Sequence, residues 1–200
     1  METGHLKTRY ERTEVFKRTL ATCQSNLTKY FLSTFHPAPT WDTLKTRLTG
    51  LRVATGTSFL TCRICEEGEM GHFFEKTKQI VLCANHIPDQ DFNSTVTHEL
   101  IHAYDDARIK INYSVPEHVA CSEIRAVNLS GECKEEQKGW FGPKHDYTNC
   151  VVTRARANVK ASPHFQLTKE EAEQAVTQVW DMCFNDLDPI SPQKFTKSPR

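Results

Sequence analysis

The stretch VTHELIHAYDD, residues 96–106, places His98 and His102 four residues apart, with Glu99 directly after the first histidine. On an α-helix, residues four apart are offset by only about 40° and lie one turn apart, so the two imidazoles can face one point. This spacing predicts two ligands of a tetrahedral zinc ion, as in the His-Glu-x-x-His pattern of zinc hydrolases.

Glu99 is the candidate general base of such a site. It lies about 100° around the helix from His98, near enough to deprotonate a water molecule without being a ligand. The same carboxyl group can later give the proton to a leaving amine. The pattern also arises by chance in about three random chains in a hundred of this composition, so its surroundings must decide. They are uncharged and suit a buried helix: Val96, Leu100, Ile101 and Ala103.

A catalytic zinc keeps three protein ligands, so a third one is needed. The metzincin class is excluded, because Asp105 and Arg108 stand where its glycine and third histidine belong. We favour Glu123 in ACSEIRA, 21 residues after His102, as in thermolysin-like enzymes. His118, 16 residues after His102, is the alternative third ligand, or else a hydrogen-bond donor in the transition state.

Asp105 and Asp106 follow the second histidine of the motif. A carboxylate at such a place can fix the tautomer of a ligand imidazole through its other ring nitrogen, so both are candidates for that supporting role. The alternative is an acidic pair on a solvated helix face.

The eight cysteines permit a disulfide framework with 105 possible pairings. Cys62 and Cys65, followed by Cys83 and His86, also have the spacing of a structural zinc ribbon. Spacing alone leaves zinc ligands, disulfides and reduced core thiols all open.

The apolar patterns predict an α+β fold that is mostly helical with a small antiparallel sheet. With the His-Glu-x-x-His motif on one of the helices, we expect this fold to be a minimal zincin-like metalloprotease. β-rich runs at 58–65 and 72–83 predict the sheet, and we expect the strand at 79–83 to form the cleft edge, where an extended substrate would pair. Helices are expected at 11–23, 41–51, 93–108, 116–130 with Gly131 as C-cap, 148–159, and 168–184 with a capping box of Thr168 and Glu171. We expect an N-terminal helical region at 1–57, a catalytic domain at 58–188 and a disordered tail at 189–200.

Composition excludes several classes of protein. Lys plus Arg and Asp plus Glu both number 25, so there is no basic field and direct nucleic-acid binding is not expected. No apolar run approaches the roughly 20 residues of a membrane helix. Acidic residues in the N-terminal segment argue against a secretory signal or a typical cleaved presequence.

VTHELIHAYD, VACSEIRAVNLSGEC and DMCFNDLDP together resemble the mitochondrial inner-membrane metalloproteases that process and help assemble ATP synthase, a family whose vertebrate members are also described as Ku-binding proteins. The likeness covers the chain from about Cys62 to Asp188. It implies a zinc endopeptidase attached peripherally to the inner membrane on the intermembrane-space side, with one Zn²⁺ on His98 and His102 and with Glu99 catalytic.

The resemblance also bears on cysteines and partners. It implies oxidised cysteines, which favours disulfides at Cys62, Cys65, Cys83, Cys121, Cys133, Cys150 and Cys183. It implies a protein substrate, for which the ATP synthase subunit a precursor is the candidate. The alternative function is a non-proteolytic assembly chaperone or interaction scaffold stabilised by zinc and disulfides.

Overall fold

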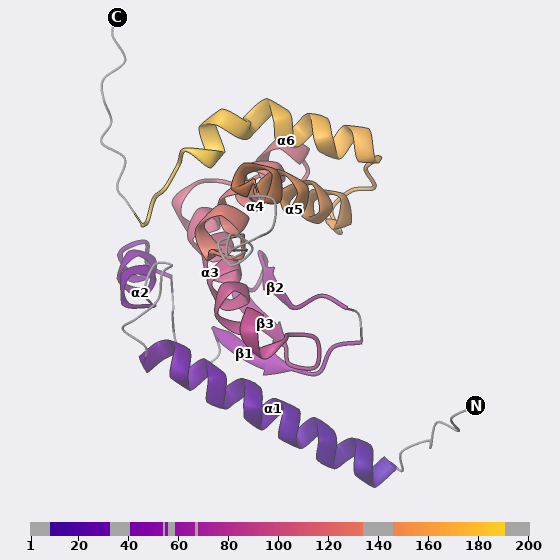
Figure 1. Ribbon diagram of the computed structural model, residues 1–200. Helices are drawn as coiled ribbons and strands as arrows, with labels where there is room; N and C mark the ends of the chain where they lie inside the picture. Colours follow the sequence, from indigo (N-terminus) through magenta and orange to yellow (C-terminus); the bar gives the residue numbers. More distant parts are fainter. Residues whose placement is uncertain are drawn as a thin grey trace, which may run out of the picture.

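The computed structural model describes residues 9–32, 41–53, 55, 59–66, 68–133 and 146–190, and the end of the predicted tail, 191–200, lies outside them. The described chain is mostly helical with one small sheet, as predicted (Figure 1). Its elements are α1 (Arg9–Leu32), α2 (Trp41–Gly50), β1 (Leu60–Arg63), β2 (Gly71–Phe74), β3 (Gln79–Cys83), the 3₁₀ turn η1 (Asp89–Asp91), α3 (Phe92–Arg108), α4 (Pro116–Ser130), α5 (Tyr147–Ala161) and α6 (Lys169–Phe184).

The sheet is mixed, which corrects the prediction of an antiparallel one. Its order is β1-β3-β2, with β2 antiparallel to β3 and β1 parallel to it. A disulfide between Cys65 and Cys83 ties the ends of the parallel pair together. The strand at 79–83 is therefore central, and β2 is an edge strand of the described sheet. Alternation of apolar residues predicts which side chains a sheet buries, but it does not encode the order or direction of the strands.

Helix α3 carries the His-Glu-x-x-His motif through the centre of the molecule. Its apolar face is fully buried at Val96, Leu100 and Ile101, which confirms that the motif lies on a buried helix. It packs against α4 on one side and against β2 and β3 on another. This position presents the motif to the space between the sheet and α4.

Helix α4 lies between two hydrophobic cores. Ala126 and Leu129 belong to the core that α3 forms with the sheet, α1 and α2. Ile124 and Val127 belong to the core formed with α5 and α6. The helix ends as predicted at Gly131, whose φ of 84° is a left-handed conformation that glycine adopts without steric cost.

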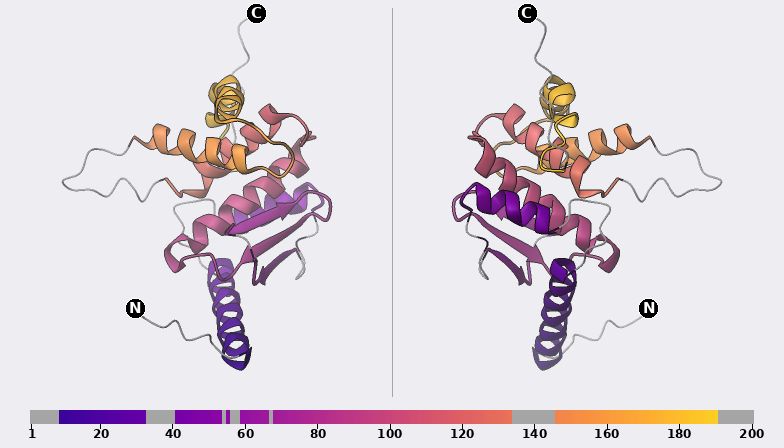
Figure 2. Two further views of the ribbon diagram at one scale, coloured as in Figure 1. Left: turned by 90° about the vertical axis from the view of Figure 1, so that its right-hand side faces the viewer. Right: turned by 90° about the vertical axis from the view of Figure 1, so that its left-hand side faces the viewer.

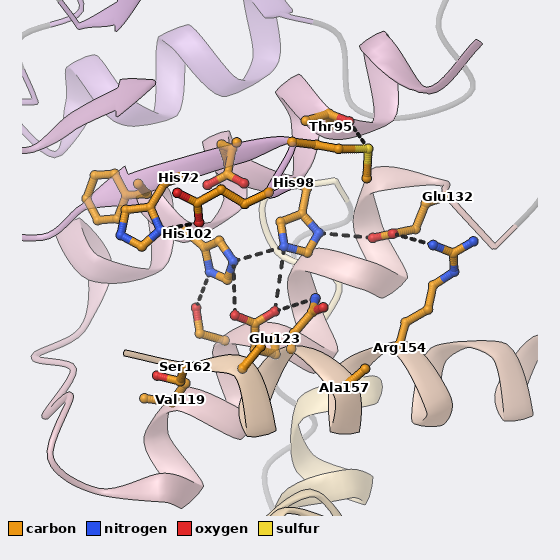
Figure 3. A pocket seen from close by; sticks show the side chains of 18 of the residues that line it. His72, Thr95, His98, His102, Val119, Glu123, Glu132, Arg154, Ala157 and Ser162 are labelled. Carbon is orange, nitrogen blue, oxygen red and sulfur yellow. Dashed lines mark hydrogen bonds and ion pairs between the residues drawn. The ribbon is translucent and has the colours of Figure 1, made fainter. Parts of the chain in front are cut away.

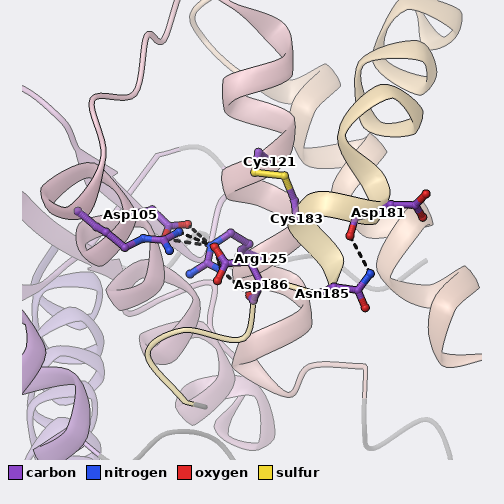
Figure 4. The surroundings of a disulfide bond; sticks show 8 residues. Asp105, Cys121, Arg125, Asp181, Cys183, Asn185 and Asp186 are labelled. Carbon is purple, nitrogen blue, oxygen red and sulfur yellow. Dashed lines mark hydrogen bonds and ion pairs between the residues drawn. A yellow bond between two sulfur atoms is a disulfide. The ribbon is translucent and has the colours of Figure 1, made fainter. Parts of the chain in front are cut away.

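A buried ionic cluster joins α3, α4 and the segment after α6. Arg125 of α4 donates from Nε to both carboxylate oxygens of Asp105, at 3.0 and 2.8 Å, and its guanidinium also binds Asp186 (Figure 4). The Cys121–Cys183 disulfide lies one helical turn away and ties α4 to α6. Helix α6 begins with the predicted capping box of Thr168 and Glu171.

Helices α1 and α6 lie at opposite ends of the molecule (Figures 1 and 2). A disulfide joins Cys23 of α1 to Cys62 of β1, and the hydroxyl of Tyr30 lies 2.8 Å from that of Thr97 on the motif helix. The N-terminal helices thus share a core with the rest of the fold, and the predicted boundary at residue 57 stays a prediction. Among the described helices, none combines the length and the apolar character needed to cross a membrane.

Candidate metal centre

The two histidines of the motif face each other. The Nε2 atoms of His98 and His102 are 3.1 Å apart, and the rings meet edge to face with centroids 4.8 Å apart (Figure 3). Their four-residue spacing on α3 produces this geometry, because residues one turn apart project from the same face of the helix.

Glu123 supplies a third donor from the neighbouring helix α4. Its Oε2 lies 3.6 Å from Nε2 of His98, and its Oε1 lies 3.5 Å from Nε2 of His102. These three side chains form a group whose donor atoms all lie within 4.8 Å of one another. Ligands about 2.0–2.1 Å from a tetrahedral zinc are separated by about 3.3–3.4 Å, so the donor set fits such an ion. Glu123 is thus brought to the histidines, as the preferred alternative requires.

His118, the rival candidate, lies elsewhere. Its side chain is exposed, and its Nδ1 accepts a hydrogen bond from the backbone amide of Asn112 at 3.1 Å. It lies in the first turn of α4, which begins at Pro116, whereas Glu123 lies further along the helix. The structure therefore does not group His118 with His98 and His102.

The outer ring nitrogens of both histidines have partners that sequence reasoning missed. Nδ1 of His98 lies 2.9 Å from Oε1 of Glu132, and Nδ1 of His102 lies 2.8 Å from the hydroxyl of Ser122. Such contacts fix which nitrogen carries the proton and leave Nε2 free to bind a metal. Ser122 directly precedes Glu123 in the sequence. Its hydroxyl next to a candidate ligand is the one feature of the sequence that could have indicated a partner for an outer ring nitrogen.

Asp105 and Asp106 do not take the supporting role predicted for them. Asp105 is buried against Arg125, and Asp106 accepts hydrogen bonds from Lys78 and Tyr113. Both residues follow His102 on α3, but each carboxylate is directed to a cation or hydroxyl of another segment. The motif helix is packed on several sides, so these two positions are neither solvated nor turned toward the histidines.

Glu99 lies beside the three donors and is itself buried. Burial raises the pKa of its carboxyl group to about 7, against the opposing effects of the His98 charge and of a hydrogen bond from the backbone of Phe73. A group with a pKa near neutrality is suited to accept and return a proton. The role of general base stays a prediction for Glu99.

The electrostatics of the group favour a bound cation. Although burial acts in the opposite direction, the charges of His102 and His98 and the hydrogen bonds from His98 and Asn158 lower the pKa of Glu123 to about 2. Burial likewise opposes the effect on His98, yet Glu123 and Glu132 raise its pKa well above the ordinary value. Two carboxylates around a pair of imidazoles therefore attract positive charge to this point.

The site opens into a cavity of about 650 Å³. One wall is the edge strand β2 with the residues before it, and the opposite wall is formed by α5 and the segment that follows it. The lining includes Glu69, Met70, Gly71, His72, Phe73, Val119, Ala157, Asn158, Ser162 and His164. A cavity with a strand edge on one side is suited to an extended chain.

The cysteines of the suspected zinc ribbon are paired in disulfides, so that alternative is wrong. Cys62 pairs with Cys23, Cys65 with Cys83, Cys121 with Cys183, and Cys133 with Cys150. All seven cysteines proposed as disulfide partners are thus oxidised. The eighth partner, Cys23, was not singled out because nothing in its surroundings on a long helix indicates a disulfide.

A helix-borne His-Glu-x-x-His pair with an acidic third donor is the arrangement typical of zinc-dependent peptidases. The model of the Peptidase M76 family matches residues 22–191, and the chain belongs to that family. No solved structure matches the chain significantly.

Relatives from distant organisms bear one name. The mitochondrial inner membrane protease ATP23 homolog of Xenopus laevis is 42% identical over 135 residues, which cover 65% of this chain and 57% of the relative. The human homolog is 42% identical over 135 residues, 65% of this chain and 54% of the relative. The Schizosaccharomyces pombe protein is 36% identical over 153 residues, 74% of this chain and 81% of the relative. The chain thus spans little more than half the length of the frog and human relatives.

Proposed function

We propose that this chain is a zinc-dependent endopeptidase with a zincin-like fold that acts at the mitochondrial inner membrane, as a peripheral protein on the intermembrane-space side. The observation that carries the proposal is the convergence of His98, His102 and Glu123 beside the buried carboxyl group of Glu99, at the wall of a cavity. Membership of a peptidase family and the names of the relatives support the activity and the place.

In this mechanism His98, His102 and Glu123 would hold the metal. A zinc ion bound there supplies Lewis acidity, which acidifies water and polarises a peptide carbonyl. Glu99 accepts a proton from the attacking water as the water oxygen bonds to the carbonyl carbon. The same carboxyl group then gives that proton to the amine nitrogen as the carbon–nitrogen bond breaks.

The substrate would lie along β2. This strand has β3 as its only strand neighbour within the described sheet, and Gly71 and Phe73 line the cavity next to Glu99. An extended peptide that pairs with this edge would pass its backbone across the metal site. The strand at 79–83, which was predicted to pair with the substrate, cannot do so because both of its edges are already paired.

The Glu99→Gln variant tests the proposal. We expect it to retain the fold and bound zinc while peptide cleavage falls at least about 1,000-fold, since the amide cannot accept a proton. Zinc content by mass spectrometry and cleavage of a candidate substrate, the ATP synthase subunit a precursor, are the two measurements. Cleavage at the normal rate would show that Glu99 is not the base, and ATP synthase assembly that survives in the variant would indicate the alternative, a chaperone function separate from proteolysis.

A pair of variants tests the third ligand. Glu123→Ala should lose zinc, and His118→Ala should retain it, because Glu123, unlike His118, is grouped with the two histidines. Metal content is measured after dialysis against a weak chelator. Retention in Glu123→Ala together with loss in His118→Ala would reverse the assignment.

A further inference from the structure

Helix α5 contributes a second layer of polar side chains around the candidate ligands. Nδ2 of Asn158 donates to Oε2 of Glu123 at 2.9 Å. Nη1 of Arg154 donates to Oε2 of Glu132 at 3.3 Å, and Glu132 in turn contacts His98 (Figure 3). Arg154 and Asn158 are four residues apart, so one face of α5 reaches both carboxylates.

We propose that α5 is an outer clamp on the metal site, in which Arg154 holds Glu132 against His98 and Asn158 holds Glu123 toward the two histidines. The residues of this clamp are positioning residues that act through the ligands and set the affinity for the metal. The inference rests on the metal site of the proposed function and deepens it.

The first arm of the clamp fixes the ring of His98. Oε1 of Glu132 accepts hydrogen bonds from Nδ1 of His98 and, at 3.0 Å, from the hydroxyl of Ser130. Its Oε2 accepts a hydrogen bond from Nη1 of Arg154. The side chain of Glu132 is 16% exposed, so its carboxylate is held from several directions in a largely buried place. With the Nδ1 proton of His98 engaged in this way, Nε2 remains the nitrogen directed at the metal site.

The second arm fixes the carboxylate of Glu123. A glutamate side chain has three rotatable bonds, and ordering it on metal binding costs conformational entropy. The hydrogen bond from Asn158 holds the carboxylate between the two imidazoles beforehand, with one oxygen near each ring. Less of the binding free energy is then spent on ordering this ligand.

A disulfide closes the clamp. Cys133 directly follows Glu132, and its partner Cys150 lies one helical turn before Arg154 on α5. The two partners of the Glu132–Arg154 ion pair are therefore attached to the two ends of one covalent link. This link holds α5 next to the end of α4, where Glu132 must lie to reach His98.

The test measures the dissociation constant for zinc by competition with a chromophoric chelator, together with the visible spectrum of the cobalt-substituted protein. We expect Glu132→Ala and Asn158→Ala each to weaken zinc binding about 10- to 100-fold, and to change the cobalt spectrum, while the unfolding midpoint of the metal-free protein moves little. Arg156→Met is the matched control, because Arg156 lies on the same helix but pairs with Glu173 of α6 at 3.0 Å. It should bind zinc as the wild type does.

The outcomes separate the clamp from the metal site itself. Wild-type zinc affinity in both Glu132→Ala and Asn158→Ala would overturn the clamp, and so would lower stability of the metal-free protein with unchanged affinity. Should Glu132→Ala fail to fold, the isosteric Glu132→Gln takes its place, and unchanged affinity in it counts against the inference. If the wild type binds no zinc, or Glu123→Ala binds it equally well, the proposed metal site fails instead.

Discussion

A Cβ atom on Gly71 would lie 3.0 Å from both Cγ and Oε1 of Glu99. The main chain of β2 thus packs directly on the carboxyl group that we assign as general base. Contacts this short are closer than ordinary van der Waals separation, so any side chain at residue 71 must displace Glu99. The glycine at the start of the edge strand therefore decides where the base lies.

Gly71→Ala should lower kcat about 10- to 100-fold, because a general base displaced by even a fraction of an ångström transfers a proton poorly. Zinc affinity should not change, since the three atoms nearest to an added Cβ all belong to Glu99 and not to the three candidate ligands. Steady-state kinetics and zinc titration are the measurements. The exposed Gly50 at the end of α2, whose added Cβ meets nothing within 4 Å, supplies the control Gly50→Ala. Full activity in Gly71→Ala would show that Glu99 tolerates the displacement.

The Arg125–Asp105 pair is expected to matter for stability rather than for chemistry. Both side chains are 1% exposed, so removing the cation leaves a buried carboxylate without its main partner. Arg125→Met should lower the free energy of unfolding by about 3–5 kcal/mol. Replacing both residues, as Asp105→Leu with Arg125→Met, should recover part of this loss, because the double variant has no buried carboxylate at residue 105 that lacks its main partner.

Urea unfolding measures these differences. Arg156→Met is the comparison, because its ion pair with Glu173 is partly exposed and should contribute less than about 1 kcal/mol. Equal losses in Arg125→Met and Arg156→Met would contradict the assignment of a structural role to the buried pair.

The sequence predicted those features that local rules determine. The four-residue spacing of His98 and His102 requires only a helix, and the capping box at Thr168 and the left-handed Gly131 follow from the backbone needs of helix ends. Glu123 could be predicted as a candidate because the third ligand in this class comes from a neighbouring helix at a limited separation.

Other features depend on contacts between distant segments, which local patterns do not encode. β1 pairs in parallel with β3 although β2 lies between them in the sequence. Cys23 forms a disulfide with Cys62, which is 39 residues away in the sequence. Glu132 contacts His98 from just beyond the end of α4, so this contact depends on how α4 packs against α3. Asp105 was assigned to a histidine because of its place on the motif helix, yet Arg125, twenty residues further on, binds it.

Acid should weaken the ionic cluster through Asp186. Burial alone would raise the pKa of this carboxyl group, but the hydrogen bond from Arg108 and the charges of Arg125 and Arg108 outweigh it and lower the pKa below the ordinary value of 3.8. The carboxylate form is thus favoured in the folded state. Its contribution to stability is complete above pH 3.8 and is lost as the pH falls through the lower folded-state pKa.

Urea unfolding of the wild type and of Asp186→Asn between pH 6 and the acid limit checks this sign. The wild type should be the more stable protein at pH 6, and the difference should shrink toward zero as the pH falls below about 3.8. Asp181→Asn, an exposed change on α6, should differ from the wild type by less than about 0.5 kcal/mol throughout. A difference between wild type and Asp186→Asn that does not vary with pH would exclude the carboxylate charge as its cause.

The disulfides should differ in their contribution to stability according to the length of chain that each one closes. The Cys121–Cys183 bond spans 62 residues and the Cys65–Cys83 bond spans 18. From the loss of chain entropy in the unfolded state, the longer loop is worth about 4 kcal/mol and the shorter about 3 kcal/mol. Paired Cys→Ala variants of each bond, compared by urea unfolding, should therefore rank in this order. The opposite order would mean that native contacts around Cys65 and Cys83, where two parallel strands end together, contribute more than chain entropy does.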